Sequence, residues 1–202
     1  MSGIIWLASY PKSGNTWMRV FLTNYLKNGD EPADINELET RAISSSRLLF
    51  DESIGIEASD LTTDEIDRLR PAVYRNLAEN GEPPILIKVH DAYTLNSESQ
   101  PLFPADATQQ VIYLIRHPFD VAVSYAHHNG NTVEKSTAAL NDSRHGLCTS
   151  AKKLTNQLRQ RLLSWSEHVR SWVDFSGLPI HVVRYEDLKA DPGSVFAGVI
   201  GK

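Results

Sequence analysis

Four short apolar segments constrain the fold of this chain more than any other feature. They are nearly continuous in apolar residues and rich in β-branched side chains: residues 4–8 (IIWLA), 85–89 (ILIKV), 111–115 (VIYLI) and 180–183 (IHVV). Strands that are covered on both faces have this composition, which is typical of parallel sheets. Because helical patterns separate the segments, we expect right-handed crossovers between the strands. The sequence therefore predicts an α/β fold in which helices flank a central parallel sheet.

The helices next to these strands are predicted from apolar spacing and from residues that favour helix ends. Residues 15–27 carry apolar side chains close to helical spacing. The pattern Thr62-x-x-Glu65 is typical of a capping box, so we expect a helix to begin there. Pro118 predicts the first residue of a further helix, since the N–H that it lacks is not needed at that position.

A long apolar stripe predicts a helix over residues 152–175 whose apolar face packs on the core. The stripe consists of Leu154, Leu158, Leu162, Trp165, Val169 and Trp172. Three other stretches, residues 29–55, 91–107 and 129–150, show no clear pattern. The last of them is polar and suits either a mobile loop that acts as a lid or a plain surface excursion.

The composition excludes several classes of protein. Twenty Lys and Arg against 25 Asp and Glu give a formal charge of −5, which argues against a nucleic-acid or anionic-membrane binder. An anion must therefore be held by local geometry. The single cysteine, Cys148, excludes an internal disulfide and a cysteine-based zinc cluster. No apolar run reaches the ~18–20 residues of a membrane span, and the first residues do not resemble a signal peptide, so we expect a cytoplasmic protein.

The segment SYPKSGNTW, residues 9–17, follows the first predicted strand directly. Pro11 ends the strand because it has no N–H for the ladder, and Gly14 permits a turn before the helix that Thr16 opens. Such a turn directs unpaired amides and the positive end of a helix at one point. Lys12 adds a charge, and Ser13 and Thr16 add hydroxyl donors. The segment therefore predicts an oxyanion-binding pocket.

Two alternatives stand beside that interpretation. An ordinary tight turn with a surface lysine would have the same local sequence. A nucleotide kinase of the P-loop type would use the same strand, loop and helix. However, a Walker A loop reads G-x-x-x-x-G-K-[ST], whereas here Lys12 precedes Gly14. No acidic residue ends a following strand to hold Mg²⁺, and we expect no metal.

Polar side chains also stand at the ends of two other predicted strands. Lys88 and His90 alternate with a valine, so both side chains point to the same face. Histidine is the side chain best suited to proton transfer at neutral pH. Arg116 ends a strand, and Ser124 follows on a helix, where a guanidinium and a hydroxyl can bind a phosphate together. The alternatives are a hydrogen-bonded edge histidine beside a solvated lysine, and an Arg116 that caps carbonyls or pairs with Asp120.

Four motifs in this order resemble those of the sulfotransferases that use 3′-phosphoadenosine 5′-phosphosulfate (PAPS). They are PKSGNTW (11–17), KVH (88–90), RHPFDVAVSY (116–125) and RYEDL (184–188), each at the end of a predicted strand. The resemblance covers nearly the whole chain. It implies one domain over residues 1–202 with a P-loop-type three-layer α/β sandwich.

The resemblance also implies a role for each candidate residue. The loop residues Lys12, Ser13, Gly14, Asn15, Thr16 and Trp17 would bind the 5′-phosphosulfate, and Arg116 and Ser124 the 3′-phosphate. Trp17 and Tyr185 would lie near the adenine. His90 would take the proton of the acceptor, Lys88 would contact the sulfuryl group, and Lys12 would stabilise the bridging oxygen. The predicted activity is sulfuryl transfer from PAPS, without a metal, to a small-molecule hydroxyl or amine.

Two departures from the family pattern limit what the resemblance implies. Many cytosolic members continue the histidine motif with Leu-Pro, whereas this chain continues with Asp91, Ala92 and Tyr93. The acceptor therefore stays open between a small hydroxyl compound, a lipid, a glycan and an amine. Family members also usually continue with a basic, glycine-containing segment that residues 1–202 lack, so a truncated domain is expected. A non-catalytic nucleotide- or partner-binding module derived from a sulfotransferase is the main alternative function.

Overall fold

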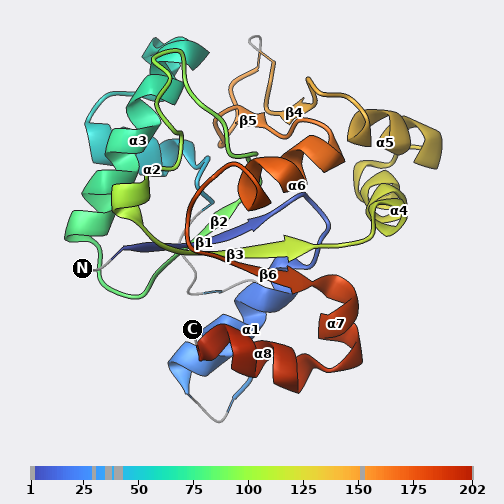
Figure 1. Cartoon of the computed structure of the whole chain (residues 1–202). Coiled ribbons are helices and arrows are strands. Elements are labelled where there is room, and N and C mark those ends of the chain that lie inside the picture. The colour runs from blue at the N-terminus through green and yellow to red at the C-terminus, as the bar shows by residue number, and fades with distance from the viewer. Residues whose placement is uncertain (1–2, 29–30, 35–37, 39–42, 151–152, 202) are drawn as a thin grey trace.

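A four-stranded parallel sheet forms the centre of the molecule (Figure 1). The computed structural model describes residues 3–28, 31–34, 38, 43–150 and 153–201. The strand order is β2-β1-β3-β6, with β1 (Ile4–Ser9), β2 (Ile85–Val89), β3 (Thr108–Ile115) and β6 (Ile180–Arg184). Trp6 pairs with Ile87 on one side and with Val111 on the other, and every pairing in the sheet is parallel. The four predicted strands are confirmed.

Helices cover both faces of this sheet, so the chain forms the predicted three layers. One face packs on α3 (Thr63–Asn80), α2 (Arg47–Ile54) and α6 (Trp165–Val173). The other face packs on α1 (Asn15–Lys27) and α8 (Pro192–Ile200), which lie together below the sheet in Figure 1. Successive residues of a strand point to opposite faces, which explains why the strands are apolar at nearly every position.

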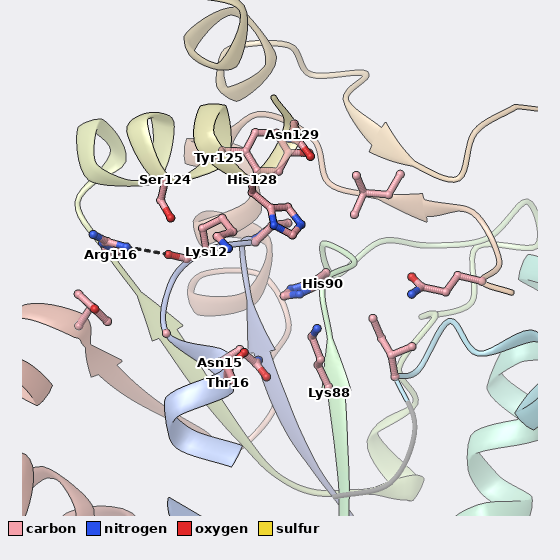
Figure 2. Close-up of a pocket in the computed structure, with 16 residues that line it drawn as sticks. Lys12, Asn15, Thr16, Lys88, His90, Arg116, Ser124, Tyr125, His128 and Asn129 are labelled. Atoms are coloured by element: carbon pink, nitrogen blue, oxygen red, sulfur yellow. Dashed lines mark hydrogen bonds between the residues drawn. The ribbon is translucent and has the colours of Figure 1, made fainter. Parts of the chain in front are cut away.

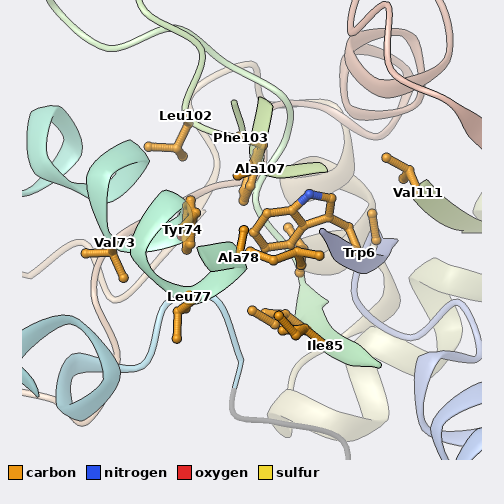
Figure 3. Packing of buried hydrophobic residues seen from close by; sticks show 14 of the residues in the cluster. Trp6, Val73, Tyr74, Leu77, Ala78, Ile85, Leu102, Phe103, Ala107 and Val111 are labelled. Carbon is orange, nitrogen blue, oxygen red and sulfur yellow. The ribbon is translucent and has the colours of Figure 1, made fainter. Parts of the chain in front are cut away.

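Trp6 lies at the centre of the larger of these two core layers (Figure 3). Its ring has no exposed surface and meets Tyr74 and Phe103 edge-on, at centroid distances of 4.9 and 5.1 Å. Its indole N–H donates to Thr108 Oγ1 at 2.9 Å, so the polar atom of the buried ring is satisfied. Strand β1 therefore joins the sheet to α3 at this point.

The predicted helix starts are confirmed. Thr62 and Glu65 form the capping box that opens α3. Helix α4 (Pro118–Asn129) begins at Pro118. The remaining elements are α5 (Val133–Leu140), α7 (Tyr185–Ala190), the 3₁₀ turns η1 (Ala58–Asp60) and η2 (Ala105–Ala107), and the short strands β4 (Gly146–Leu147) and β5 (Gln160–Arg161).

The prediction of one helix over residues 152–175 is wrong. Only α6 is helical, and residue 152 lies outside the described residues. Leu163 has a φ of 61°, and Ser164 forms a capping box with Glu167, so the helix begins after this turn. Leu158 and Leu162 are buried in two different clusters, with Trp6 and with Tyr10. Their spacing of four residues therefore reflects two separate burials along an extended segment and not one helical face.

The stretches without a pattern contain more structure than the sequence predicted. Helix α5 lies within residues 129–150, capped by the side chain of Thr132 and with Leu140 buried, and α2 lies within residues 29–55. Part of the latter stretch lies outside the described residues. Both helices have only eight residues, which is too short for a clear periodic signal. Among the described helices, none is long and apolar enough to cross a bilayer.

Candidate functional site

The strand order determines where a ligand can bind. Strand β1 pairs with β2 on one side and β3 on the other. The loops that leave the carboxyl ends of the neighbouring strands β1 and β3 lead to α1 and α4, which lie on opposite sides of the sheet (Figure 1). Open α/β sheets bind ligands in the crevice at such a point. A cavity of about 480 Å³ lies there (Figure 2). Nine predicted site residues line it: Lys12, Gly14, Asn15, Thr16, Lys88, His90, Arg116, Ser124 and Tyr185.

The loop between β1 and α1 depends on Gly14. Its φ is 100°, and a Cβ at this position would lie 2.7 Å from Cδ2 of Tyr185. Lys12 also has a positive φ, of 72°. No side chain caps the first turn of α1, which begins directly after Gly14. The first amides of this 13-residue helix therefore remain available to an anion.

Asn15 and Ser13 have different positions from the rest of the loop. The Asn15 side-chain amide donates to Leu7 O at 2.8 Å and to Ser9 Oγ at 3.2 Å, which ties α1 to β1. Ser13 is buried without lining the cavity, and its Oγ has no hydrogen-bond partner among the described residues. A buried hydroxyl is normally satisfied. The loop thus holds one hydroxyl donor that no described protein group uses.

His90 is buried at the end of β2, on the wall of the cavity (Figure 2). Its Nδ1 lies 2.8 Å from the carbonyl oxygen of Ser9. A carbonyl only accepts, so Nδ1 carries the proton and Nε2 keeps its lone pair. Burial and the neighbouring charge of Lys88 lower the pKa of His90 to about 3, so the ring is neutral at physiological pH. This arrangement suits a general base.

Buried hydrogen bonds hold the backbone that follows His90. His168 Nε2 donates to His90 O at 3.1 Å, and the Tyr113 hydroxyl, which must then be the donor, lies 2.8 Å from His168 Nδ1. Burial lowers the pKa of His168 to about 4, so this ring is neutral too. The Trp172 indole donates to Asp91 O at 3.0 Å. His168 and Trp172, both on α6, therefore hold the backbone carbonyls at the end of β2.

Asp91, which departs from the family pattern, forms a buried ion pair with Arg70. Arg70 NH1 and NH2 each donate to one oxygen of the Asp91 carboxylate, at 3.0 Å in both cases. Both side chains are about 1% exposed. Arg70 Nε donates to the hydroxyl of Tyr74 at 3.0 Å. The residue after His90 therefore anchors β2 to α3 and does not line the cavity.

The cavity is cationic although the chain is acidic. Lys12, Lys88 and Arg116 line it, and no carboxylate occurs among the described residues of its lining. Burial and the charges of Arg19 and Lys12 lower the pKa of Lys88 to about 8. Crowded cations in a partly buried site favour an anionic ligand, because it removes their mutual repulsion. Local geometry thus gathers positive charge in a place that the net charge of the chain does not predict.

Arg116 contacts a backbone carbonyl, as one interpretation of the sequence predicted, and also lines the cavity. Its NH1 donates to Lys12 O at 3.2 Å, and its Nε lies 3.9 Å from Asp120 Oδ2, too far for a hydrogen bond. That Nε is buried without a hydrogen-bond partner among the described residues. The guanidinium carbon lies 4.4 Å from the centre of the Tyr185 ring. Figure 2 shows Arg116 beside Ser124, on the side of the cavity away from Lys88.

Trp17 is the predicted site residue that lies outside the cavity together with Ser13. Its ring is 37% exposed and meets Tyr185 edge-on, at a centroid distance of 6.1 Å. Trp17 therefore supports the ring of Tyr185, while Tyr185 itself lines the cavity.

The sequence did not identify several residues of the lining: Pro11, Ile43, Tyr125, His128, Asn129, Leu147 and Gln157. A signal existed for His128, which follows Ser124 by four residues and so lies on the same face of α4. Gln157 and Ile43 come from distant parts of the chain and carry no such signal. No group of three or more His, Cys, Asp or Glu side chains within the described ranges could hold a metal ion.

Comparisons with known proteins point to one family. The model of a family described as "Sulfotransferase domain" matches residues 3–200. Sulfotransferase 1B1 of Canis lupus familiaris is 27% identical over 188 residues, which cover 92% of this chain and 54% of the relative.

Two solved structures resemble this chain to different degrees. Retinol dehydratase in a complex with retinol and PAP is 21% identical, with a TM-score of 0.53, over 96% of this chain and 57% of that one. A mouse sulfotransferase complexed with PAP is 19% identical, with a TM-score of 0.49, over 100% of this chain and 58% of that one. The chain therefore spans little more than half the length of these relatives.

Proposed function

Because this chain belongs to the sulfotransferase family, whose domain model covers residues 3–200, we propose that it transfers a sulfuryl group from PAPS to a small-molecule hydroxyl or amine. One observation carries the proposal. A cationic cavity without a described carboxylate brings the glycine loop, Arg116 and Ser124 to the same place as Lys88 and His90. The glycine loop and the Arg116–Ser124 pair provide two positions for anions, and His90 provides a base for the acceptor.

The residues present fit the donor. The first amides of α1, the Lys12 ammonium and the Thr16 hydroxyl bind the phosphosulfate end, whereas the unpartnered Ser13 Oγ is buried behind the lining of the cavity. The buried, unpartnered Nε of Arg116 and the Ser124 hydroxyl bind the 3′-phosphate. Tyr185 packs beside the purine. PAP (adenosine 3′,5′-bisphosphate), which is bound in both neighbouring structures, is the expected product.

The reaction is an in-line displacement at sulfur. His90 Nε2 accepts the proton of the acceptor hydroxyl while the acceptor oxygen forms its bond to sulfur. The bond from sulfur to the bridging phosphate oxygen breaks, and Lys12 and the loop amides stabilise the charge left on that oxygen. Lys88 orients the sulfuryl oxygens. Their negative charge offsets Lys88, which after burial is the second cause of the low pKa of His90.

Nucleotide binding tests the donor site. Calorimetric titration should show PAP binding at least about tenfold more tightly than adenosine 5′-diphosphate, because only PAP places a phosphate at Arg116. We expect the same affinities with and without Mg²⁺. Equal affinity for the two nucleotides, or a Mg²⁺ requirement, would instead favour a nucleotide kinase.

The His90→Ala variant separates catalysis from binding. It should lose transfer of labelled sulfuryl groups and keep a PAP affinity within about twofold of wild type, because His90 contacts the reacting hydroxyl and not the nucleotide. Loss of PAP binding in this variant would make His90 structural. Tight PAP binding by the wild type without any transfer would favour the non-catalytic module.

A further inference from the structure

The residues assigned to the donor form one part of the cavity lining, and the remaining part carries polar side chains. Its hydrogen-bonding side chains are His128, Asn129 and Gln157, and its apolar walls are Ile43 and Leu147. We infer that the acceptor is a polyhydroxylated, saccharide-like compound and not a flat phenol or a lipid. This inference rests on the proposed function, since it describes what the same site receives opposite the donor.

The end of α4 supplies two of the polar groups. His128 lies one turn after Ser124, on the face of α4 that looks towards Lys12 and His90 in Figure 2. His128 and Asn129 are exposed, and the imidazole of His128 has no partner among the described residues. The neighbouring Tyr125 hydroxyl is already used, because it lies 3.1 Å from His145 Nε2 and also contacts the side chain of Asn129. The available groups at this end are therefore His128 and the rest of the Asn129 amide.

Gln157 supplies a third polar group on a backbone that is firmly held. Its Oε1 accepts from Gln160 Nε2 at 2.8 Å, which leaves the Gln157 NH₂ group as a donor to the cavity. The backbone on either side is paired with the start of α2 and the residue two before it: Arg47 N donates to Asn156 O at 3.0 Å, and Leu158 N donates to Ser45 O at 2.7 Å. This donor is thus positioned before any ligand arrives.

A saccharide matches these groups and an apolar ring does not. Ring hydroxyls both donate and accept, so they satisfy an imidazole, an amide and an NH₂ group at once, while the C–H faces of the sugar pack on Ile43 and Leu147. A phenol or a lipid would remove water from the same polar groups without replacing its hydrogen bonds, which costs affinity. Sites for apolar ligands are lined mainly by hydrophobic and aromatic side chains. Here three hydrogen-bonding side chains line the cavity beside Ile43, Leu147 and the ring of Tyr125.

Transfer of radiolabelled sulfuryl groups from PAPS tests the inference. The acceptors are three saccharides (glucose, N-acetylglucosamine and chitobiose) and three apolar compounds (4-nitrophenol, 2-naphthol and retinol). The variants are His128→Phe and Gln157→Leu, with His127→Phe as the matched control, because His127 is exposed on the same helix end and does not line the cavity. PAP affinity is measured for every variant to show that the donor site is intact.

We expect wild type to label the saccharides with a kcat/KM at least about tenfold above that for the apolar compounds. His128→Phe and Gln157→Leu should each lower the kcat/KM for the saccharides by about tenfold or more. His128→Phe should also raise the kcat/KM for 2-naphthol. The control, His127→Phe, should change neither value. Labelling of apolar acceptors alone, labelling of no acceptor in either class, or unchanged saccharide transfer in both variants would overturn the inference. The first and third of these results leave the proposed function intact, whereas labelling of no acceptor together with tight PAP binding would favour the non-catalytic module.

Discussion

At the scale of single residues, Gly14 joins backbone geometry to ligand binding. Its φ of 100° is strained for any residue with a Cβ, and Tyr185 occupies the space that a Cβ would need. Gly55 also has a positive φ, of 73°, but no atom lies within 4 Å of its Cβ position. A comparison of the two glycines therefore separates the effect of backbone strain from that of steric contact with Tyr185.

Replacing each of these glycines by alanine tests that distinction. Both Gly14→Ala and Gly55→Ala should lower the free energy of unfolding in urea by about 1–2 kcal/mol, because of the left-handed backbone. Only Gly14→Ala should also weaken PAP binding in a calorimetric titration, since Tyr185 must move. Equal PAP affinity in the two variants would mean that the loop tolerates the added methyl group.

Lys88 makes nucleotide binding depend on pH. Burial and the charges of Arg19 and Lys12 lower its pKa to about 8, so its ammonium loses the proton as the pH rises through that value. PAPS affinity should therefore be constant near pH 7 and fall by about tenfold towards pH 9.5, as the charge-assisted contact of Lys88 with the sulfuryl group is lost. His90, with a pKa of about 3, stays neutral throughout and adds nothing.

The matched variant for this prediction is Lys88→Arg, which stays charged over the whole range. Calorimetric titrations of both proteins between pH 7 and 9.5 should show the fall in PAPS affinity only for wild type. A parallel fall in the variant would assign the pH dependence to another group.

At the scale of elements, ion pairs connect α3 to two different parts of the chain. Arg70 reaches Asp91 at the end of β2 and is buried, whereas Arg75 reaches Asp106 at 2.8 Å and both partners are exposed. Removing one partner of a buried pair leaves an uncompensated charge in a poorly solvated place, whereas exposed charges are screened by water. The position of His90 therefore depends on the first pair and not on the second.

Two Asp→Asn substitutions compare these pairs on one helix. Asp91→Asn should lower the free energy of unfolding by about 3–5 kcal/mol, and Asp106→Asn by about 0–1 kcal/mol. Urea denaturation followed by circular dichroism measures both values. Similar small losses in the two variants would show that Arg70 finds another partner, for which Asp67 at 3.8 Å is the nearest carboxylate.

At the scale of the whole molecule, ligand binding and folding are coupled through β1. This strand contributes residues to the core layers on both faces of the sheet, and the glycine loop follows it directly. A nucleotide bound at the loop therefore stabilises the folded chain as a unit. At about one hundred times its Kd, PAP should contribute about 2.7 kcal/mol of stability.

For a chain of this size, that stabilisation corresponds to a rise in Tm of about 5–10 °C. Differential scanning calorimetry with PAP, and with adenosine 5′-diphosphate at the same concentration as the control, measures the shift. The rise should be unchanged in EDTA. A PAP shift that disappears in EDTA would mean that a metal ion takes part in binding.

Much of this architecture could be predicted from local sequence. The four strands, the start of α3 at Thr62 and the start of α4 at Pro118 follow from apolar periodicity and capping preferences, which act over a few residues. The loop at Gly14 and the strand-end positions of Lys88, His90 and Arg116 follow from the rule that parallel strands present their carboxyl ends at one edge. Nine of the eleven candidate residues consequently line one cavity.

Only the tertiary structure decided the contacts that join distant segments. The spacing of Leu158 and Leu162 fits a helix equally well, and only their burial in separate clusters shows that the segment is extended. Arg70 and Asp91 are 21 residues apart, and Gln157 meets the cavity from far along the chain. The physical reason is range. Local sequence determines the backbone conformation and which polar side chains stand at the end of a strand. The partner of a buried charge, and the residues that face His90 across the cavity, depend on how whole layers of the fold pack.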